Sequence, residues 1–213
     1  AVAQWIAEQT GASVGYLTEA ANTVGAQWVG TLPGANGKNA GQMLAGGLKA
    51  ALLLNNEPAF DSAVGAQGLQ GAEMVVSLSP FKANLDIADV LLPIAPWTET
   101  PGSFVNAEGL LQSFYAVARP LGDTRPAWKV LRVLANLLGL SGFQQETAQE
   151  VLAAVLAERG LAGQAAPLRL PVSALSNGTQ IAADLNPVSV RPAVASIYQL
   201  DGVVRRAPSL QLT

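Results

Sequence analysis

Three short apolar runs, separated by polar turns, dominate the middle of the chain. Residues 51–54, 74–78 and 89–92 are each apolar over most of their length, which is the pattern of strands covered on both faces. Residues 60–69 fit a helix between the first two runs, and residues 83–87 fit a helical turn before the third. Strand, helix, strand, helix, strand in this order predicts a parallel sheet with right-handed crossovers.

Apolar positions at helical spacing and their bounding Gly, Pro and Asn residues predict further elements on either side of this sheet. Leu131 and Leu134 lie on the apolar stripe of one of these helices, and we expect both to belong to the core. The remaining predictions are helices over residues 2–10, 22–29, 39–49, 126–138 and 145–159, strands over 13–17 and 110–118, and a loop over 93–109.

The fold class expected from this order is α/β, a Rossmann-like parallel sheet with flanking helices, plus an extended C-terminal arm. We expect residues 1–140 to form the α/β domain, residues 141–160 a helix, and residues 161–213 an extended tail. The tail is assigned as an arm because it is rich in Pro, Ala and Ser and has no strong hydrophobic period.

The end of the tail carries residue types that are favoured at interfaces. Tyr198, Arg205 and Arg206 are of this kind, and two adjacent arginines on an acidic chain invite a carboxylate partner. We therefore expect residues 197–213 to dock as an extended segment, on this domain or on a neighbouring subunit.

Composition excludes several classes of function. The chain has 213 residues, no cysteine and no histidine, which rules out Fe–S clusters, zinc fingers, disulfides and Ser–His–Asp catalysis within it. Its net charge is −3 and its basic residues are scattered, so we expect no nucleic-acid partner. No apolar stretch reaches the ~18 residues of a membrane span, and we expect no membrane insertion. Only 13% of the residues are charged, which favours a partly apolar surface that meets other protein.

Three motifs have the outline of a catalytic or phosphate-binding site but lack its remaining parts. Ser13 fits the nucleophile motif G-x-S-x-G, but the chain has no histidine to accept the serine proton. Ser79 and Lys82 fit the motif S-x-x-K, but its companion motifs S-D-N and K-T-G are missing. The glycine-rich stretch 34–41 lacks the spacing of a P-loop or of a dinucleotide fingerprint. We expect ordinary turns and loops at all three places.

Glu99 and Glu108 bracket a glycine loop beyond the third predicted strand. Paired carboxylates can act as general acid and base, and ligands of open α/β sheets bind near the carboxyl ends of the strands. Because no histidine or basic pocket accompanies them, we expect these carboxylates to accept hydrogen bonds from loop amides instead. No catalytic residue and no metal ligand is predicted.

The stretch 88–112 carries a family motif. It contains Ala-Asp-Val-Leu-Leu-Pro and then Glu-Thr-Pro-Gly-Ser-Phe-Val-Asn-Ala-Glu-Gly-Leu-Leu-Gln, and it resembles the pattern A-D-V-x-L-P … E-x-x-G-[TS]-x-x-N-x-E-G-R-x-Q of the molybdopterin oxidoreductase family. The segments 52–58 and 119–128 also fit that family, so the resemblance covers about the first 140 residues. It implies Asn106, Glu108 and Gln112 as candidates for a vestigial cofactor pocket.

The chain departs from the family pattern at two positions. The arginine of E-G-R-x-Q is Leu110 here, and an arginine would be a natural partner for the phosphates of an anionic cofactor. Asn55 replaces the family's glycine in the turn after the first strand. Both departures argue against a bound molybdopterin, so no cofactor is expected in this segment.

The tail points to one branch of the family. Residues 197–211, Ile-Tyr-Gln-Leu-Asp-Gly-Val-Val-Arg-Arg-Ala-Pro-Ser-Leu-Gln, resemble the C-terminal signature of the large iron–sulphur subunits of bacterial respiratory complex I, NADH:quinone oxidoreductase. The resemblance implies a peripheral-arm location on the cytoplasmic face of the inner membrane. It also implies other peripheral-arm subunits as partners, and Fe–S clusters in an N-terminal region that precedes this segment.

Three functions remain open at this point, and one of them is a free-standing α/β domain that binds a small molecule. The first is a non-catalytic structural and assembly portion of that peripheral arm, which supports electron transfer from NADH to quinone by clusters located elsewhere. The alternative is the cofactor-binding domain of a molybdopterin-dependent oxidoreductase, and Leu110 is the residue that favours the first over the second.

Overall fold

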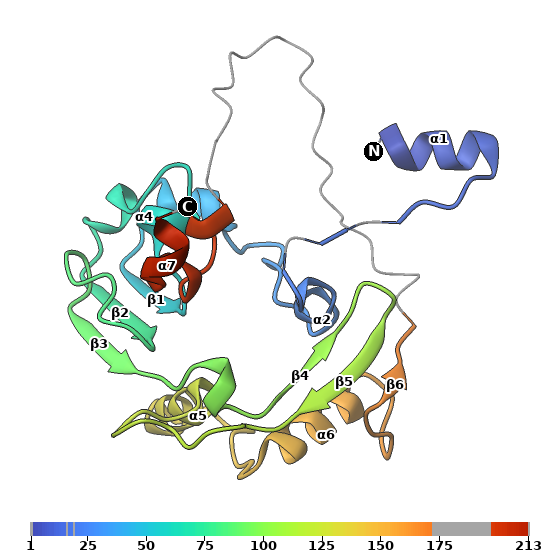
Figure 1. The fold of residues 1–213 in the computed structure, drawn as a ribbon. Coiled ribbons are helices and arrows are strands. Elements are labelled where there is room, and N and C mark those ends of the chain that lie inside the picture. Colours follow the sequence, from blue (N-terminus) through green and yellow to red (C-terminus); the bar gives the residue numbers. More distant parts are fainter. Residues whose placement is uncertain (1, 16, 19, 172–196, 213) are drawn as a thin grey trace. The chain divides into compact units, whose positions relative to one another are not determined.

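The chain folds into two compact units, each built from segments that are distant in the sequence (Figure 1). The computed structural model describes residues 2–15, 17–18, 20–171 and 197–212. The first unit contains Ala1–Leu32, Pro101–Tyr115 and Gln145–Asn177. The second unit contains Pro33–Thr100, Ala116–Gln144 and Gly178–Thr213.

The second unit holds the predicted parallel sheet. Its strands are β1 (Ala50–Leu54), β2 (Met74–Ser79) and β3 (Val90–Pro93), and their order in the sheet is β1-β2-β3. Both neighbouring pairs are parallel, with Leu52 opposite Val76 and Val76 opposite Val90. The predicted α/β fold with a parallel sheet and flanking helices is therefore confirmed.

The first strand is less buried than its apolar sequence predicts. β1 lies at the edge of the sheet, and both Leu52 and Leu54 are 47% exposed. The prediction of a strand covered on both faces is wrong for β1, because the described residues of this unit leave one face of the edge strand uncovered. The same prediction holds better for the central strand β2, where Val75 and Leu78 are buried.

Helices beside the sheet are shorter than predicted. α3 (Ala40–Leu44) begins with a capping box, in which the Asn39 and Gln42 side chains each accept a hydrogen bond from the other residue's backbone N–H. It ends where Gly46 takes a φ of 105°, a conformation that leaves the helix. The predicted helix 60–69 is instead α4 (Pro58–Asp61) followed by a 3-10 turn, η1 (Gln67–Leu69).

The helix α5 (Ala127–Leu137) matches its predicted range but not its predicted burial. Ala135 is buried, whereas Leu131 and Leu134 are half-buried. The prediction that these two leucines are core residues is therefore wrong for this unit, because the residues around α5 cover only part of its apolar stripe.

The first unit contains an antiparallel sheet that the sequence analysis did not predict. β4 (Gly102–Val105), β5 (Leu110–Phe114) and the short β6 (Leu168–Arg169) lie in that order. β4 occupies part of the predicted loop 93–109, which also contains the 3-10 turn η2 (Trp97–Glu99). Gly102 pairs with Phe114, and a Cβ at Gly102 would lie 2.7 Å from the end of the Phe114 ring, so a larger residue there would force the ring to move.

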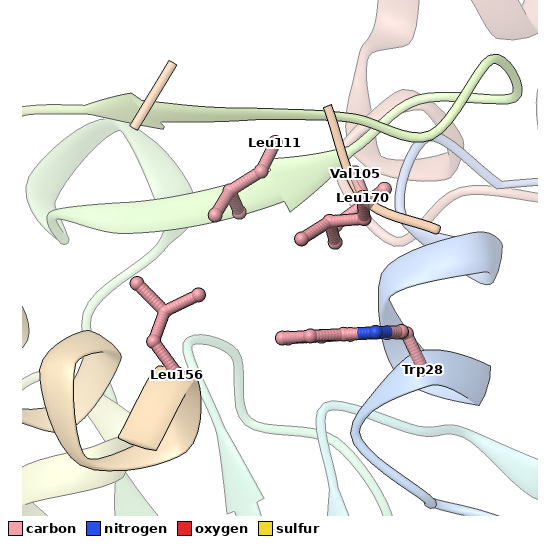
Figure 2. Close-up of a cluster of buried hydrophobic side chains, with 5 residues drawn as sticks. All are labelled: Trp28, Val105, Leu111, Leu156 and Leu170. Carbon is pink, nitrogen blue, oxygen red and sulfur yellow. The ribbon is translucent and has the colours of Figure 1, made fainter. Parts of the chain in front are cut away.

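Two helices supply the core beneath this sheet. α2 (Thr23–Trp28) contributes Trp28 and α6 (Ala148–Glu158) contributes Leu156. Figure 2 shows both side chains directed toward the strand residues Val105 and Leu111 and toward Leu170. These five buried residues bring together segments from position 28 to position 170 of the sequence.

At the N-terminus, α1 (Val2–Thr10) confirms the predicted helix. The predicted strand 13–17 is wrong, because its described residues have no strand partner and are exposed. No helix in the described part of the chain is both long enough and apolar enough to span a membrane.

The C-terminal segment docks on the second unit, as predicted, but in helical turns rather than in extended form. It consists of η3 (Ile197–Gln199), η4 (Val204–Arg206) and α7 (Pro208–Gln211). Figure 1 shows this segment in red, and the ion pair between Arg205 of η4 and Asp61 joins it to α4. Local hydrogen bonds such as that from the Arg205 N–H to the Asp201 carbonyl close these turns.

Candidate functional site

The turn after β1 takes a conformation that favours glycine. Asn55 has a φ of 47°, and its backbone N–H donates to the Leu78 carbonyl at 2.8 Å. Asparagine tolerates this left-handed region better than most residues, which explains how it can replace the family's glycine here. The turn leads directly into Glu57, whose side chain is only 12% exposed.

Polar side chains at the end of β2 are bonded within the unit. Ser77 is fully buried and its Oγ accepts from the Asn84 amide at 3.0 Å, while Ser79 Oγ accepts from the Phe81 N–H at 3.1 Å. Lys82 is exposed. Ser79 therefore organises the turn after its strand, as the sequence analysis expected for the S-x-x-K match.

A cavity of about 250 Å³ lies at the carboxyl ends of the parallel strands, where ligands of such sheets bind. Its wall comes from the strand ends, the segment 94–100 and the C-terminal segment. Most of the wall is apolar, and among the described residues that line it Asp201 is the one with a charge. The lining residues include Leu54, Asn55, Phe81, Ile94, Trp97 and Val203.

Beside this cavity, two arginines of the tail bind two acids that follow β1. Arg206 donates from Nη1 and Nη2 to the two carboxylate oxygens of Glu57, at 2.8 Å each. Arg205 donates from Nη2 to Asp61 Oδ1 at 2.6 Å, and its Nη1 lies 3.6 Å from Glu57 Oε1. The hydrogen bond to Glu57 raises the pKa of Arg206, so this guanidinium stays charged at any ordinary pH.

The predicted pocket candidates lie on the β4–β5 hairpin of the first unit. Asn106 Oδ1 accepts from the N–H groups of Glu108, at 3.0 Å, and of Leu110, at 2.9 Å. Glu108 is exposed, and Gln112 lies opposite Phe104 on the ladder, where both side chains are exposed. Asn106 therefore shapes the turn, and the structure places Gln112 on the outer face of the sheet.

Glu99 belongs to the second unit, so the two acids that bracket the glycine loop lie in different units. Its Oε2 accepts a hydrogen bond from the Leu121 N–H at 3.0 Å. Glu99 therefore holds a loop amide, which is the structural role expected from the sequence.

The other weighed motifs lie in exposed segments. Ser13 and the glycine-rich stretch 34–41 are exposed throughout. Among the residues that the structure describes, no three acidic side chains gather in a way that could hold a metal ion.

The sequence indicates the two arginines as contact residues but does not indicate their partners. Glu57 and Asp61 precede Arg206 by 149 and 145 positions, and no local pattern connects residues so far apart. Phe60 and Phe81, whose rings contact Arg205 and Arg206, were also missed. The one available signal was the position of Glu57 in the turn that follows a predicted strand.

Comparison with known proteins gives a family and a set of relatives. The family model described as molybdopterin oxidoreductase matches residues 3–137, more than half of the chain. A "putative formate dehydrogenase" of Staphylococcus aureus (strain USA300) is 46% identical over 66 residues, and its counterpart in the bovine strain RF122 is 44% identical over the same length. These matches cover 31% of this chain and 7% of each relative, so the chain corresponds to a small part of the curated relatives it matches.

Proposed function

Because the chain belongs to the molybdopterin oxidoreductase family, we propose that it is a structural domain of a large redox enzyme that keeps the family fold without holding the family's cofactor. Its role is to support the assembly and electron transfer of a complex whose redox centres lie in other regions. The observation that carries this proposal is the strand-end cavity, where Asp201 is the one charged residue among the described residues of the lining.

The residues of this cavity do not fit a phosphate-bearing pterin. An anionic ligand needs cationic side chains or directed amides, whereas a carboxylate repels it. The two nearby arginines are engaged by Glu57 and Asp61. Residues 201–203 of the chain's own tail form part of the wall.

The hairpin supports the same proposal independently. Leu110 stands where the family motif has arginine, and it is half-buried on β5 next to the core residue Leu111. A leucine at this position contributes apolar area and offers no donor to a phosphate group.

We further propose that the parent assembly is a bacterial NADH:quinone oxidoreductase, with this domain in its peripheral arm on the cytoplasmic face. The resemblance of residues 197–211 to the C-terminal signature of that branch supports this assignment. The absence of cysteine and histidine is consistent with clusters that are bound by another region of the parent chain.

A second candidate is the cofactor-binding domain of a molybdopterin enzyme such as a formate dehydrogenase. The names of the relatives reported above favour this candidate over the first. In that case a pterin would have to be held by residues beyond the strand-end cavity described here.

Turnover of the purified parent enzyme separates the two candidates. The first predicts NADH-dependent reduction of a quinone and no oxidation of formate. Formate oxidation with an artificial acceptor, without NADH:quinone activity, would establish the second candidate and refute the first.

A further inference from the structure

A cluster of charged side chains in the second unit joins the segment after β1 to the C-terminal segment. Glu57 precedes α4 and Asp61 is the last residue of that helix, while Arg205 and Arg206 lie in η4 of the C-terminal segment. The Arg205 side chain is 5% exposed, which makes it the more deeply buried of the two. A charge buried to this degree is stable only when it is paired.

Each arginine receives a carboxylate and an aromatic ring. Arg206 is held at both Nη atoms by Glu57, and its guanidinium lies 4.1 Å from the centre of the Phe81 ring. Arg205 pairs with Asp61, and its guanidinium lies 4.6 Å from the centre of the Phe60 ring. Forked hydrogen bonds and ring stacking are the contacts that select arginine over lysine. We call Glu57, Phe60, Asp61 and Phe81 the arginine-binding site.

The tail presents its arginines in a turn that it stabilises itself. Asp201 Oδ1 accepts from the N–H groups of Val203, at 2.8 Å, and of Val204, at 3.0 Å. The Gly202 carbonyl accepts from Arg206 Nη1 at 2.9 Å, which orients that guanidinium toward Glu57. Gln211 donates from Nε2 to the carbonyls of Tyr198 and Val204, and so ties α7 to this turn.

We propose that the arginine-binding site is a peptide-recognition site for a turn with two adjacent arginines, and that the chain's own residues 197–213 fill it. The segment thus acts as a tethered ligand at the edge of the sheet where ligands of this fold class bind. The proposal rests on the proposed function in one respect, since it requires that no cofactor competes for this edge. The carboxylates of the site and the guanidinium groups of the tail supply the charge complementarity.

The test separates the tail from the rest of the chain. A protease site inserted after residue 184 allows the purified protein to be cut, and gel filtration then shows whether the released fragment stays bound. A synthetic peptide of residues 197–213 is titrated by calorimetry into the cut protein after its own fragment has been washed out at high salt. We expect the fragment to co-elute with the protein and the peptide to rebind with one-to-one stoichiometry.

Variant peptides test the specificity. Arg206→Gln removes both hydrogen bonds to Glu57, and should weaken binding about tenfold or more. Arg206→Lys keeps the positive charge but cannot make both hydrogen bonds to Glu57. Its affinity should lie between those of the wild-type and Arg206→Gln peptides. Leu212→Ala is the matched control, because Leu212 is exposed at the end of α7 and its loss should leave binding unchanged.

Equal binding of the wild-type and Arg206→Gln peptides, or loss of the fragment on cutting, would overturn the proposal. If the cut protein precipitates, hydrogen exchange in the uncut chain decides: Arg206→Gln should speed exchange at the amides of residues 203–207, and unchanged exchange would refute the site. Molybdenum and pterin content are measured on the same preparations. A cofactor-free protein that releases its tail refutes only this inference, whereas bound pterin refutes the proposed function.

Discussion

Asn55 shows how a single backbone conformation positions the candidate site. Its left-handed φ turns the chain so that Glu57 follows the end of β1 at the strand-end edge, within reach of Arg206. Glycine adopts such a φ at no steric cost, asparagine at a small cost, and β-branched residues at a large one. The substitution at this position in the family motif therefore preserves the turn.

The turn can be tested with two substitutions at Asn55. Asn55→Gly should change the free energy of unfolding by less than about 0.5 kcal/mol, because glycine accepts this conformation. Asn55→Val should lower the free energy of unfolding by about 1–2 kcal/mol, because valine does not. Urea denaturation measures both values. A valine variant as stable as the wild type would show that the turn does not require a positive φ.

Gly68 permits the closest backbone contact between α3 and η1. A Cβ at this position would lie 1.8 Å from the Leu44 carbonyl oxygen, a distance that forces the backbone to move. Gly68→Ala should therefore lower the free energy of unfolding by about 1–3 kcal/mol, the range of overpacked sites. Gly71→Ala is the matched control, because no atom lies within 4 Å of its Cβ position. Equal stability of the two variants would contradict this account of the contact.

The elements differ in how far local sequence determines them. The three parallel strands were predictable because each is a short apolar run bounded by turns, and their order dictates parallel pairing. The antiparallel sheet was not predictable from local sequence. β4 lies in a stretch rich in Pro, Gly and Thr, and β6 pairs with β5 across more than 50 residues. Burial was also hard to predict, because β1 is apolar throughout yet lies at an edge.

Only the arginines of the candidate site were predictable from the sequence, and the acidic residues that bind them were not. Two adjacent arginines near the end of an acidic chain indicated a carboxylate partner, and the structure confirms that expectation. Which carboxylates would bind them depends on the three-dimensional fold, because Glu57 and Asp61 lie at the two ends of α4, far from the arginines in the sequence. The hairpin residues Asn106, Glu108 and Gln112 came from the family motif as candidates for a vestigial cofactor pocket, and that assignment stays a prediction.

The helices should differ in what their leucines contribute to stability. Leu156 of α6 is 1% exposed in the core of the first unit, so Leu156→Ala should lower the free energy of unfolding by about 2–5 kcal/mol. Leu137 of α5 is exposed, and Leu137→Ala should change it by less than about 0.5 kcal/mol. In the isolated chain, the loss of unfolding free energy caused by Leu134→Ala should lie between those of Leu156→Ala and Leu137→Ala. Thermal or chemical denaturation of the three variants checks this order, and a reversed order would contradict the assigned burial.

The chain as a whole combines few charged residues with many exposed apolar ones. Only 13% of its residues are charged, and β1 exposes Leu52 and Leu54 within its unit. The apolar stripe of α5 is also incompletely covered. Large exposed apolar patches mark interaction surfaces, and a structural domain inside a larger complex has this character.

Glu108 allows a test of whether the β4–β5 hairpin has a catalytic role in the parent complex. If the β4–β5 hairpin only shapes the first unit, Glu108→Gln in the parent complex should leave turnover and assembly near the wild-type level. Loss of a catalytic carboxylate would instead lower turnover about 100-fold or more. Steady-state kinetics of the purified complex distinguish these outcomes, with subunit stoichiometry as the control for assembly. Normal assembly with such a fall in turnover would contradict the non-catalytic assignment.

We propose that this member of the molybdopterin oxidoreductase family holds no pterin in this domain. Elemental analysis for molybdenum and tungsten, together with fluorescence of the oxidised pterin, measures this directly on the parent protein purified from its native host. We expect neither metal nor pterin above background, together with the iron of the Fe–S clusters. A stoichiometric content of pterin with its metal, lost on unfolding of the second unit, would contradict this proposal.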